Sequence, residues 1–149
     1  MEIFDYFSNE QREWIDKIRA CDWRAAEFLA DMLEQNKFHK TLGNGSLFIM
    51  ADEGKIVSFC TFTQRDCIKD DDMFPWIGFV FTTPCYRGKR YSGQIIDAAC
   101  KRAAVQDFDK VYLATDHIGL YEKYGFEYME SRIDIYGEES RIYCRKLTG

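Results

Sequence analysis

One stretch decides how this chain is interpreted: Val80-Phe81-Thr82-Thr83-Pro84-Cys85-Tyr86-Arg87-Gly88-Lys89-Arg90-Tyr91-Ser92. It joins an apolar strand, expected over 76–82, to a helix expected from about Ser92. Three of the four residues from 87 to 90 are cations. A helix start has free N–H groups and the positive end of the helix dipole, so this turn suits a phosphate group. The alternative is a basic turn that is simply solvated.

Two common nucleotide-binding motifs are absent from the sequence. Gly88 and Gly93 have the spacing of a nucleoside-triphosphate loop, but Gln94 and Ile95 stand where that loop needs Lys and Ser or Thr. The dinucleotide motif G-x-G-x-x-G is also missing, because the pair of glycines at 43–45 precedes a strand. We still expect Gly88 and Gly93 to let the backbone approach a ligand closely.

The rest of the chain predicts one mixed α/β (α+β) domain over residues 1–149. Helices are expected to begin near Ser8, with Gln11 completing a capping box, and at Asp22. A short helix is expected over 120–124, with Gly125 as its C-terminal cap. The acidic run 69–72 is expected to be a solvated loop. Further strands are expected over 47–50, 56–62, 110–114, 127–135 and 141–147, with a hairpin turn at 52–55.

Composition excludes several classes of protein. The chain is 16% aromatic and has only 10 Gly and 2 Pro, which excludes disordered and collagen-like proteins. Its net charge of −5 disfavours a broad nucleic-acid-binding face. The longest apolar run, 76–81, is far shorter than the roughly 20 residues of a membrane span, and the first residues do not resemble a secretory signal. We therefore expect a soluble, cytoplasmic protein that binds neither nucleic acid nor membrane.

Cysteine and histidine usage predicts neither disulfides nor a metal site. None of the six cysteines forms a Cys-x-x-Cys pair, and we expect them to be mostly buried free thiols. His39 and His117 lie far apart in the chain, so no metal is expected. Cys85 lies beside three cations, a setting that suits a reactive thiol, but no His or Asn arrangement accompanies it. A redox thiol protein would depend on Cys85.

Two motifs together resemble the GNAT superfamily of acyl-CoA-dependent N-acetyltransferases. The phosphate loop of that family reads Gln/Arg-x-x-Gly-x-Gly/Ala and is preceded by a strand and a Pro-x-Tyr-Arg-Gly turn, and residues 84–92 are similar to this turn and loop. Its second hallmark, Leu/Phe-Tyr-x-x-x-Gly-Phe, is matched over 120–126. Arg90 departs from the first Gly of the loop, and Ser92 from the Gly/Ala position. The Arg90 side chain must turn away from a bound pyrophosphate or join it as a cation.

The resemblance implies a fold and a reaction. Helices would flank a central mixed, mostly antiparallel sheet that is splayed between its fourth and fifth strands. The reaction would transfer an acetyl group from acetyl-CoA to a primary amine of a small molecule or peptide by direct attack. The alternative is a non-catalytic acyl-CoA-binding sensor or partner-binding module on the same fold.

The resemblance also implies the site residues. The strand end Val80, Phe81 and Thr82 would hold the pantetheine arm through backbone groups, with an N–H near Val80 facing the thioester oxygen. Tyr121 aligns with the tyrosine that protonates the leaving thiolate, although a tyrosine there can also serve packing alone. The pyrophosphate would meet the loop of Arg87, Gly88, Lys89, Arg90, Tyr91, Ser92 and Gly93.

The general base and the partner are less defined by the sequence. Asp116, His117 or a chain of waters would take the proton of the amine, with weaker candidates at Asp71, Asp72 and Glu130. The acidic balance of the chain suits a cationic acceptor. A homodimer face would use aromatic side chains expected at the surface, namely Trp76, Phe79, Tyr128 and Tyr136.

Overall fold

One seven-stranded mixed sheet is the framework of the computed structural model, which describes residues 1–147. The strand order is β1-β2-β3-β4-β5-β7-β6. Among the described residues, β4 and β5 are parallel and every other neighbouring pair is antiparallel. The strands are β1 (Glu2–Asp5), β2 (Gly45–Asp52), β3 (Lys55–Thr63), β4 (Trp76–Thr82), β5 (Lys110–Thr115), β6 (Glu127–Ile133) and β7 (Glu139–Lys146).

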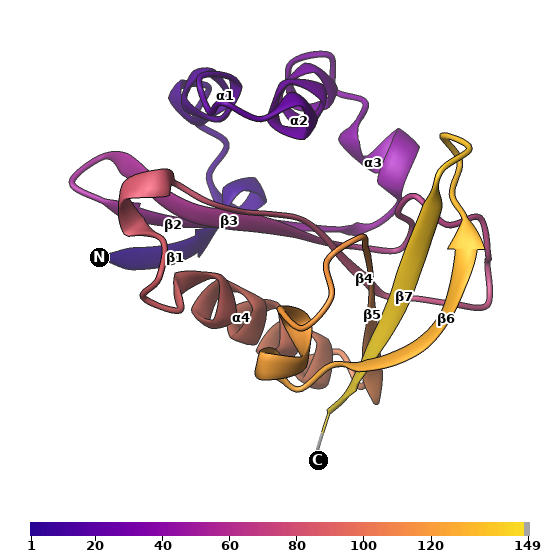
Figure 1. The fold of residues 1–149 in the computed structure, drawn as a ribbon. Coiled ribbons are helices and arrows are strands. Elements are labelled where there is room, and N and C mark those ends of the chain that lie inside the picture. The colour runs from indigo at the N-terminus through magenta and orange to yellow at the C-terminus, as the bar shows by residue number, and fades with distance from the viewer. Residues whose placement is uncertain (148–149) are drawn as a thin grey trace.

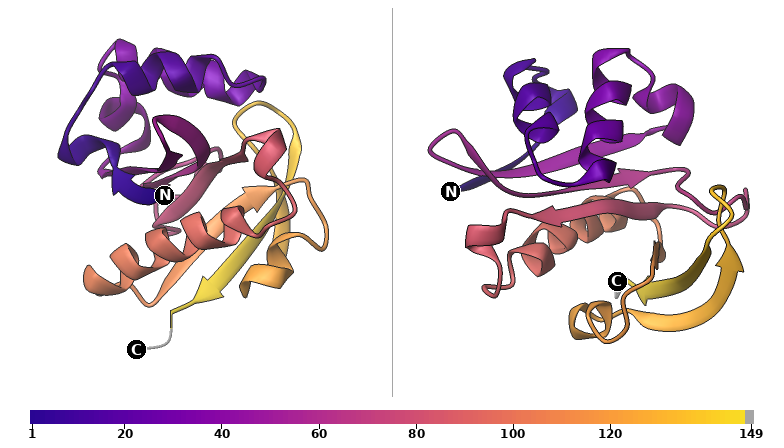
Figure 2. Two further views of the ribbon diagram at one scale, coloured as in Figure 1. Left: turned by 90° about the vertical axis from the view of Figure 1, so that its left-hand side faces the viewer. Right: turned by 45° about the horizontal axis from the view of Figure 1, so that its top comes forward.

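Helices cover both faces of this sheet (Figures 1 and 2). One face carries α1 (Glu13–Arg19), α2 (Arg24–Glu34) and α3 (Phe38–Leu42), and the other carries the long helix α4 (Tyr91–Val105). Short 3₁₀ turns complete the chain: η1 (Tyr6–Ser8), η2 (Pro84–Tyr86) and η3 (Tyr121–Tyr124). No helix within residues 1–147 is long and apolar enough to cross a bilayer.

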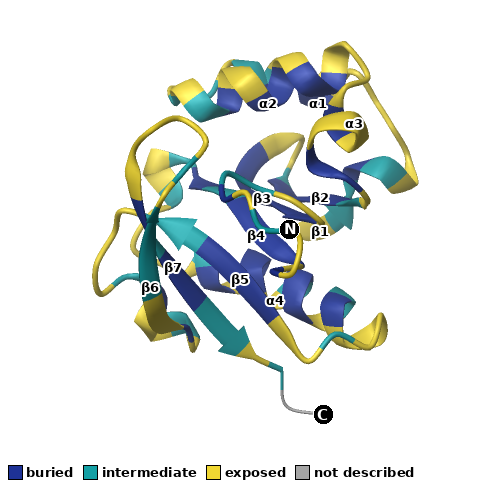
Figure 3. Cartoon of the chain, turned by 90° about the vertical axis from the view of Figure 1, so that its right-hand side faces the viewer, coloured by how far each residue is buried: buried dark blue, intermediate teal, exposed yellow. Residues whose placement is uncertain are grey.

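Each face of the sheet has its own apolar core, and Figure 3 shows the buried strands and the inward sides of the helices. Leu29 of α2 packs with Leu47 and Phe59 on the face of α1–α3. Ile95 of α4 packs with Ile77 and other residues on the opposite face. Successive strand residues enter opposite cores because side chains of a strand alternate between its faces.

The parallel junction is the shortest pairing in the sheet. β4 and β5 pair only through Trp76 with Tyr112 and Ile77 with Leu113. Beyond these two pairs the strands separate, and we call this region, 78–82 of β4 with 114–115 of β5, the splay. The predicted mixed sheet, splayed between its fourth and fifth strands and flanked by helices, is confirmed.

Helix starts and one strand differ from the sequence predictions. Ser8 lies in η1 rather than capping a helix, and the N-cap of α1 is Arg12. The N-cap of α2 is Trp23, not Asp22, and no side-chain bond caps it. The strand β1 was not predicted, since it has only four residues and lies at the sheet edge.

The expected surface aromatics divide into two groups. Trp76 is fully buried and donates its indole N–H to Met73 O at 2.6 Å, so its expected place on a dimer face is wrong. Phe79 is half-buried, whereas Tyr128 and Tyr136 are exposed. A bulky apolar strand residue that meets both neighbouring strands is readily buried, and the sequence alone does not reveal that neighbourhood.

Candidate functional site

A bulge bends β4 at the start of the splay. The register with β3 shifts between Phe59 and Thr61, so that β4 carries one extra residue there. Phe79 lies in this bulge with φ of 49°, a left-handed conformation that is uncommon for a bulky residue. Such a bulge bends its strand and interrupts regular pairing, which explains why the pairing with β5 ends after Ile77.

The backbone groups of β4 beyond the bulge are divided between its two edges. The Thr83 N–H donates to Val57 O of β3 at 2.9 Å. Because the edges alternate along a strand, Val80 and Thr82 direct their backbone groups toward the splay. The Thr82 carbonyl accepts a bond there from Arg87 Nε at 2.8 Å. Val80 and Thr82 therefore offer a partly unpaired strand edge.

Phe81 has the opposite orientation. Its carbonyl accepts a hydrogen bond from Ser58 Oγ at 2.6 Å, on the β3 side. Its buried ring stacks on Trp23, with ring centroids 5.5 Å apart, in the core beneath α2. The structure thus places Phe81 beside the splay while its backbone and ring face elsewhere.

The basic turn leads directly into α4. Gly88 has φ of 84°, and nothing lies within 4 Å of the position that a Cβ would occupy. Arg90 is the N-cap of α4 and has φ of 62°, so the position where the family motif has Gly keeps a conformation that Gly favours. Arg87, Lys89 and Arg90 are exposed, and no ion pair within residues 1–147 includes them.

The first turn of α4 is fixed to β4 and η3. Ser92 Oγ lies 2.5 Å from Thr82 Oγ1, and the Tyr91 ring packs edge-on against Tyr86. Gly93 is buried, and a Cβ there would lie 2.6 Å from Cε1 of Tyr124. The Tyr124 ring occupies the space that a Cβ would need, which explains why residue 93 is Gly, and the expected approach of a ligand to the Gly93 backbone stays a prediction.

Tyr121 begins η3 and is buried on the α4 side of the sheet, in the cluster against which Val80 packs. Its side chain is 7% exposed, and no hydrogen bond within residues 1–147 involves its hydroxyl. Burial, with smaller effects of Cys60, Tyr124 and Asp116, raises the pKa of Tyr121 to about 12. The phenol therefore keeps its proton at neutral pH and remains able to donate it.

The base candidates at the end of β5 lie in solvent. Asp116 and His117 side chains are mostly exposed, and His117 Nε2 is 4.0 Å from Asp116 Oδ1. The His117 ring is near Tyr121, with centroids 6.4 Å apart. Of the weaker candidates, Asp71 and Asp72 are exposed and Glu130 pairs with Arg132.

One acidic residue that was not among the predicted site residues lies at the bend of β4. Asp66, in the segment between β3 and β4, has a buried Oδ1 without a hydrogen-bond partner within residues 1–147. Gly78 makes room for it, since a Cβ there would collide with this oxygen. Burial raises the pKa of Asp66 to about 6, although the N–H and thiol of Cys67 oppose the rise. Perturbed buried acids of this kind are typical of functional sites.

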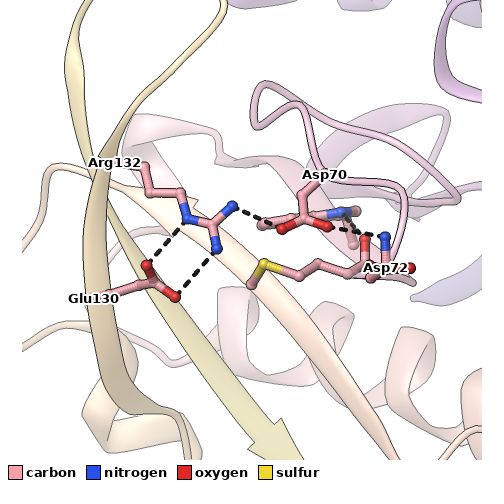
Figure 4. Close-up of polar contacts among 6 residues, drawn as sticks. Asp70, Asp72, Glu130 and Arg132 are labelled. Carbon is pink, nitrogen blue, oxygen red and sulfur yellow. Dashed lines mark hydrogen bonds and ion pairs between the residues drawn. The ribbon is translucent and has the colours of Figure 1, made fainter.

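An ion-pair cluster holds the same segment to β6 (Figure 4). Arg132 donates to Asp70 Oδ2 at 2.7 Å and to Glu130 Oε2 at 3.1 Å. The Asp72 N–H also donates to Asp70, and these bonds, the one from Arg132 first, lower the pKa of Asp70. The run 69–72 is therefore only partly a solvated loop.

Thiols and metal ligands do not form a second centre in the described residues. All six cysteines are free: Cys60 and Cys100 are buried, Cys21, Cys67 and Cys144 half-buried, and Cys85 exposed. Within residues 1–147, no group of three or more His, Cys, Asp or Glu side chains could hold a metal ion.

Structures with this fold include several acetyltransferases. The aminoglycoside 6'-N-acetyltransferase from Enterococcus faecium has a TM-score of 0.74 and 12% identity, over 100% of this chain and 98% of that one. A GNAT family acetyltransferase from Elizabethkingia anophelis with acetyl-CoA bound has a TM-score of 0.68 and 14% identity, over 98% and 97%. An acetyltransferase from Streptococcus agalactiae has 0.70 and 21%, over 98% of both chains.

Sequence comparison reaches the same family. No curated protein matches the chain. The family model described as an acetyltransferase (GNAT) domain matches residues 43–128, from the turn before β2 to the start of β6. This range includes the bulge of β4, the basic turn, α4 and Tyr121. The chain belongs to the GNAT acetyltransferase family.

Proposed function

We propose that this protein is an N-acetyltransferase that moves the acetyl group of acetyl-CoA to a primary amine. One observation carries the proposal: the partly unpaired edge of β4, the basic turn into α4 and the side chain of Tyr121, which packs in the cluster that Val80 joins, all adjoin the splay. A strand edge, a helix start and a phenol are the groups that amides, a pyrophosphate and a thiolate require, respectively.

Acetyl-CoA would bind along the splay as follows. Backbone groups of Val80 and Thr82 would pair with the amides of the pantetheine arm. Free N–H groups at the start of α4, together with Lys89 and Arg90, would hold the pyrophosphate. Arg87 would contribute less charge than expected, because its Nε already bonds to the Thr82 carbonyl.

The chemistry follows from the same arrangement. The amine attacks the thioester carbon, and negative charge develops on the thioester oxygen, which the Val80 N–H would stabilise. As the carbon–sulfur bond breaks, the Tyr121 hydroxyl would protonate the leaving thiolate. Its raised pKa keeps it protonated until the thiolate forms. The acceptor is a small-molecule or peptide amine, a class supported by the aminoglycoside acetyltransferases of similar fold.

The first test is a thermal-shift titration with acetyl-CoA, in parallel with desphospho-CoA and ATP. A ligand at 100 times its Kd adds about 2.7 kcal/mol to the free energy of unfolding, which raises Tm measurably. We expect a clear rise with acetyl-CoA and none with ATP. Lys89→Gln should weaken this response, whereas Lys101→Gln, an exposed change further along α4, should not.

Turnover is then measured as thiol release in the presence of primary amines. Release that depends on the amine supports the enzyme. Binding of acetyl-CoA without release for any amine would favour a non-catalytic acyl-CoA-binding module. An equal rise of Tm with ATP, or no rise at millimolar acetyl-CoA, would contradict both.

A further inference from the structure

Two buried polar atoms without partners meet at the bend of β4. Asp66 Oδ1 and Thr61 Oγ1 have no hydrogen-bond partner within residues 1–147. Both lie around Gly78, where a Cβ would collide with the carboxylate oxygen and lie 3.2 Å from the hydroxyl. Leaving a buried polar atom without a hydrogen-bond partner is unfavourable, so two at one point indicate a place for a ligand that bonds to them.

Asp66 Oδ1 and Thr61 Oγ1 lie at the start of the splay. Gly78 directly follows Ile77, whose pair with Leu113 is the last between β4 and β5. Ile77 faces the α4 core, so Gly78 and the Asp66 oxygen against it lie on the opposite face, that of α1–α3. Thr61 reaches the same face, because both of its neighbours in β3 belong to the α4 core.

Tyr121 and Asp66 therefore flank the splay from opposite sides of the sheet. Tyr121 belongs to the α4 core, and Val80 beside it directs backbone groups into the splay. A thioester at this point would have a proton donor on one face and a carboxylate on the other. Acetyl transfer uses both a proton acceptor and a proton donor, because the nucleophile must lose a proton while the leaving thiolate gains one.

The segment that carries Asp66 is fixed from both sides. The Ile135 N–H donates to Cys67 O at 2.9 Å, and the Arg65 N–H donates to Leu42 O at 2.8 Å. The Arg65 side chain turns away, toward the carbonyls of Lys40 and Thr41. The carboxylate is thus held in place before any ligand arrives, as an efficient site requires.

We propose that Asp66 binds the ammonium group of a cationic primary amine and accepts its proton, which makes it the general base. This inference rests on the proposed function. The ammonium gives one proton to the Asp66 carboxylate, and the neutral nitrogen forms the C–N bond. The C–S bond then breaks, the thiolate takes the Tyr121 proton, and the second proton lost by nitrogen passes through solvent to restore Tyr121. The proton on Asp66 is released to solvent after the amide leaves, which regenerates the carboxylate.

The charges around Asp66 favour a cationic acceptor over a neutral one. The titratable groups that interact with it are Cys67 on its own segment and Tyr136 on the segment between β6 and β7. Neither carries a positive charge, and Asp134, whose charge acts on both of them, is an acid. Burial, together with Asp66 and Asp134, also raises the pKa of Cys67, so this thiol stays neutral beside the carboxylate.

The kinetic test compares Asp66→Asn with Asp107→Asn, an exposed acid in a left-handed turn that Asn tolerates. Each protein is assayed with two primary amines as acetyl acceptors, 1,4-diaminobutane and 2-phenylethylamine. Asp66→Asn should lower kcat/KM for the amine at least about 100-fold and leave the acetyl-CoA thermal shift unchanged. Wild-type kcat/KM should rise through about pH 6 and fall near the pKa of the amine. The variant should instead rise up to that pKa, because it must use the neutral amine.

A second test does not depend on turnover. The Asp66 carboxyl carbon is titrated by NMR in the CoA-bound protein, with and without 20 mM of each amine. A bound ammonium should lower the Asp66 pKa by about one unit or more. If neither amine moves it, or if Asp66→Asn retains wild-type kcat/KM and pH profile, Asp66 is not the acceptor residue. A wild-type protein that fails to bind acetyl-CoA contradicts the proposed function instead.

Discussion

The Tyr124 ring covers the α carbon of Gly93 so closely that a Cβ there would lie 2.6 Å from Cε1 and 2.8 Å from Cδ1. This contact fixes the distance between α4 and η3, the turn that carries Tyr121. A methyl group would force the two elements apart, and overpacking of this kind costs about 1–3 kcal/mol. We expect Gly93→Ala to lower the free energy of unfolding by that amount in urea denaturation.

The matched control for Gly93→Ala is Gln94→Ala. Gln94 is exposed in the same turn of α4, so its truncation should leave stability within about 0.5 kcal/mol of wild type. A Gly93→Ala protein as stable as wild type would show that the ring can move aside, and the rigid packing inferred from the contact would be wrong.

Tyr121→Phe removes the proposed proton donor and keeps the ring that packs in the α4 core. We expect kcat to fall by about 10²–10⁴-fold, while the Kd for acetyl-CoA changes less than about threefold. Steady-state kinetics and calorimetry measure the two quantities. Tyr124→Phe, a neighbouring phenol in the same turn, serves as the control and should keep wild-type kcat.

The pH profile gives a separate check on Tyr121. Because its pKa is about 12, wild-type kcat should show no loss attributable to this phenol up to pH 10. An alkaline decrease of kcat near pH 9 that disappears in Tyr121→Phe would contradict the raised pKa.

Arg90→Gly relieves a left-handed backbone at the start of α4. A non-glycine residue there costs about 1–2 kcal/mol, part of which the greater freedom of glycine in the unfolded chain offsets. We expect a net gain of about 0.5–1 kcal/mol in the free energy of unfolding without ligand, and weaker acetyl-CoA binding at low salt because a cation is lost. Arg90→Lys keeps the charge and the strain, so neither quantity should change much.

Asp66 should make the protein less stable as the pH rises. Its pKa is about 6 in the folded protein and 3.8 when unperturbed, so between these values the folded state binds more protons than the unfolded state. Stability due to this group therefore falls from about pH 4 to pH 6 and stays low above. Asp66→Asn should be more stable than wild type by about 3 kcal/mol at pH 7 and nearly equal to it at pH 4. Thermal denaturation at both pH values measures this difference.

Local patterns were enough to predict most of the strands and turns around the splay. The apolar runs in β2 and β3, the turn at 52–55 and the αL residue Gly125 after η3 are properties of short segments, and the structure confirms them. The predicted start of the first helix was wrong for an equally local reason. The Asp5 carboxylate accepts a bond from the Phe7 N–H and makes a 3₁₀ turn, where Ser8 was expected to open a helix.

The acceptor side was not predictable in the same way. Asp66 and Gly78 are twelve positions apart, and only the fold brings the carboxylate against the glycine. A glycine in a strand and an acid in a loop are each ordinary in a sequence. The signal was the missing side chain within an otherwise bulky strand, Trp76-Ile77-Gly78-Phe79, which indicates that something else fills the space.

The unpaired edge of β4 has a consequence for how such a protein can be altered. A ligand that pairs with Val80 and Thr82 is recognised through peptide groups, which are the same whatever side chains the strand carries. Alanine scanning would therefore miss the contact entirely, since it leaves each amide in place. A change to the backbone, such as an ester bond in place of one of these peptide bonds, would reveal the contact. Substitutions of side chains during evolution would also leave this backbone contact intact. The binding edge of β4 can therefore be retained while the rest of the sequence diverges.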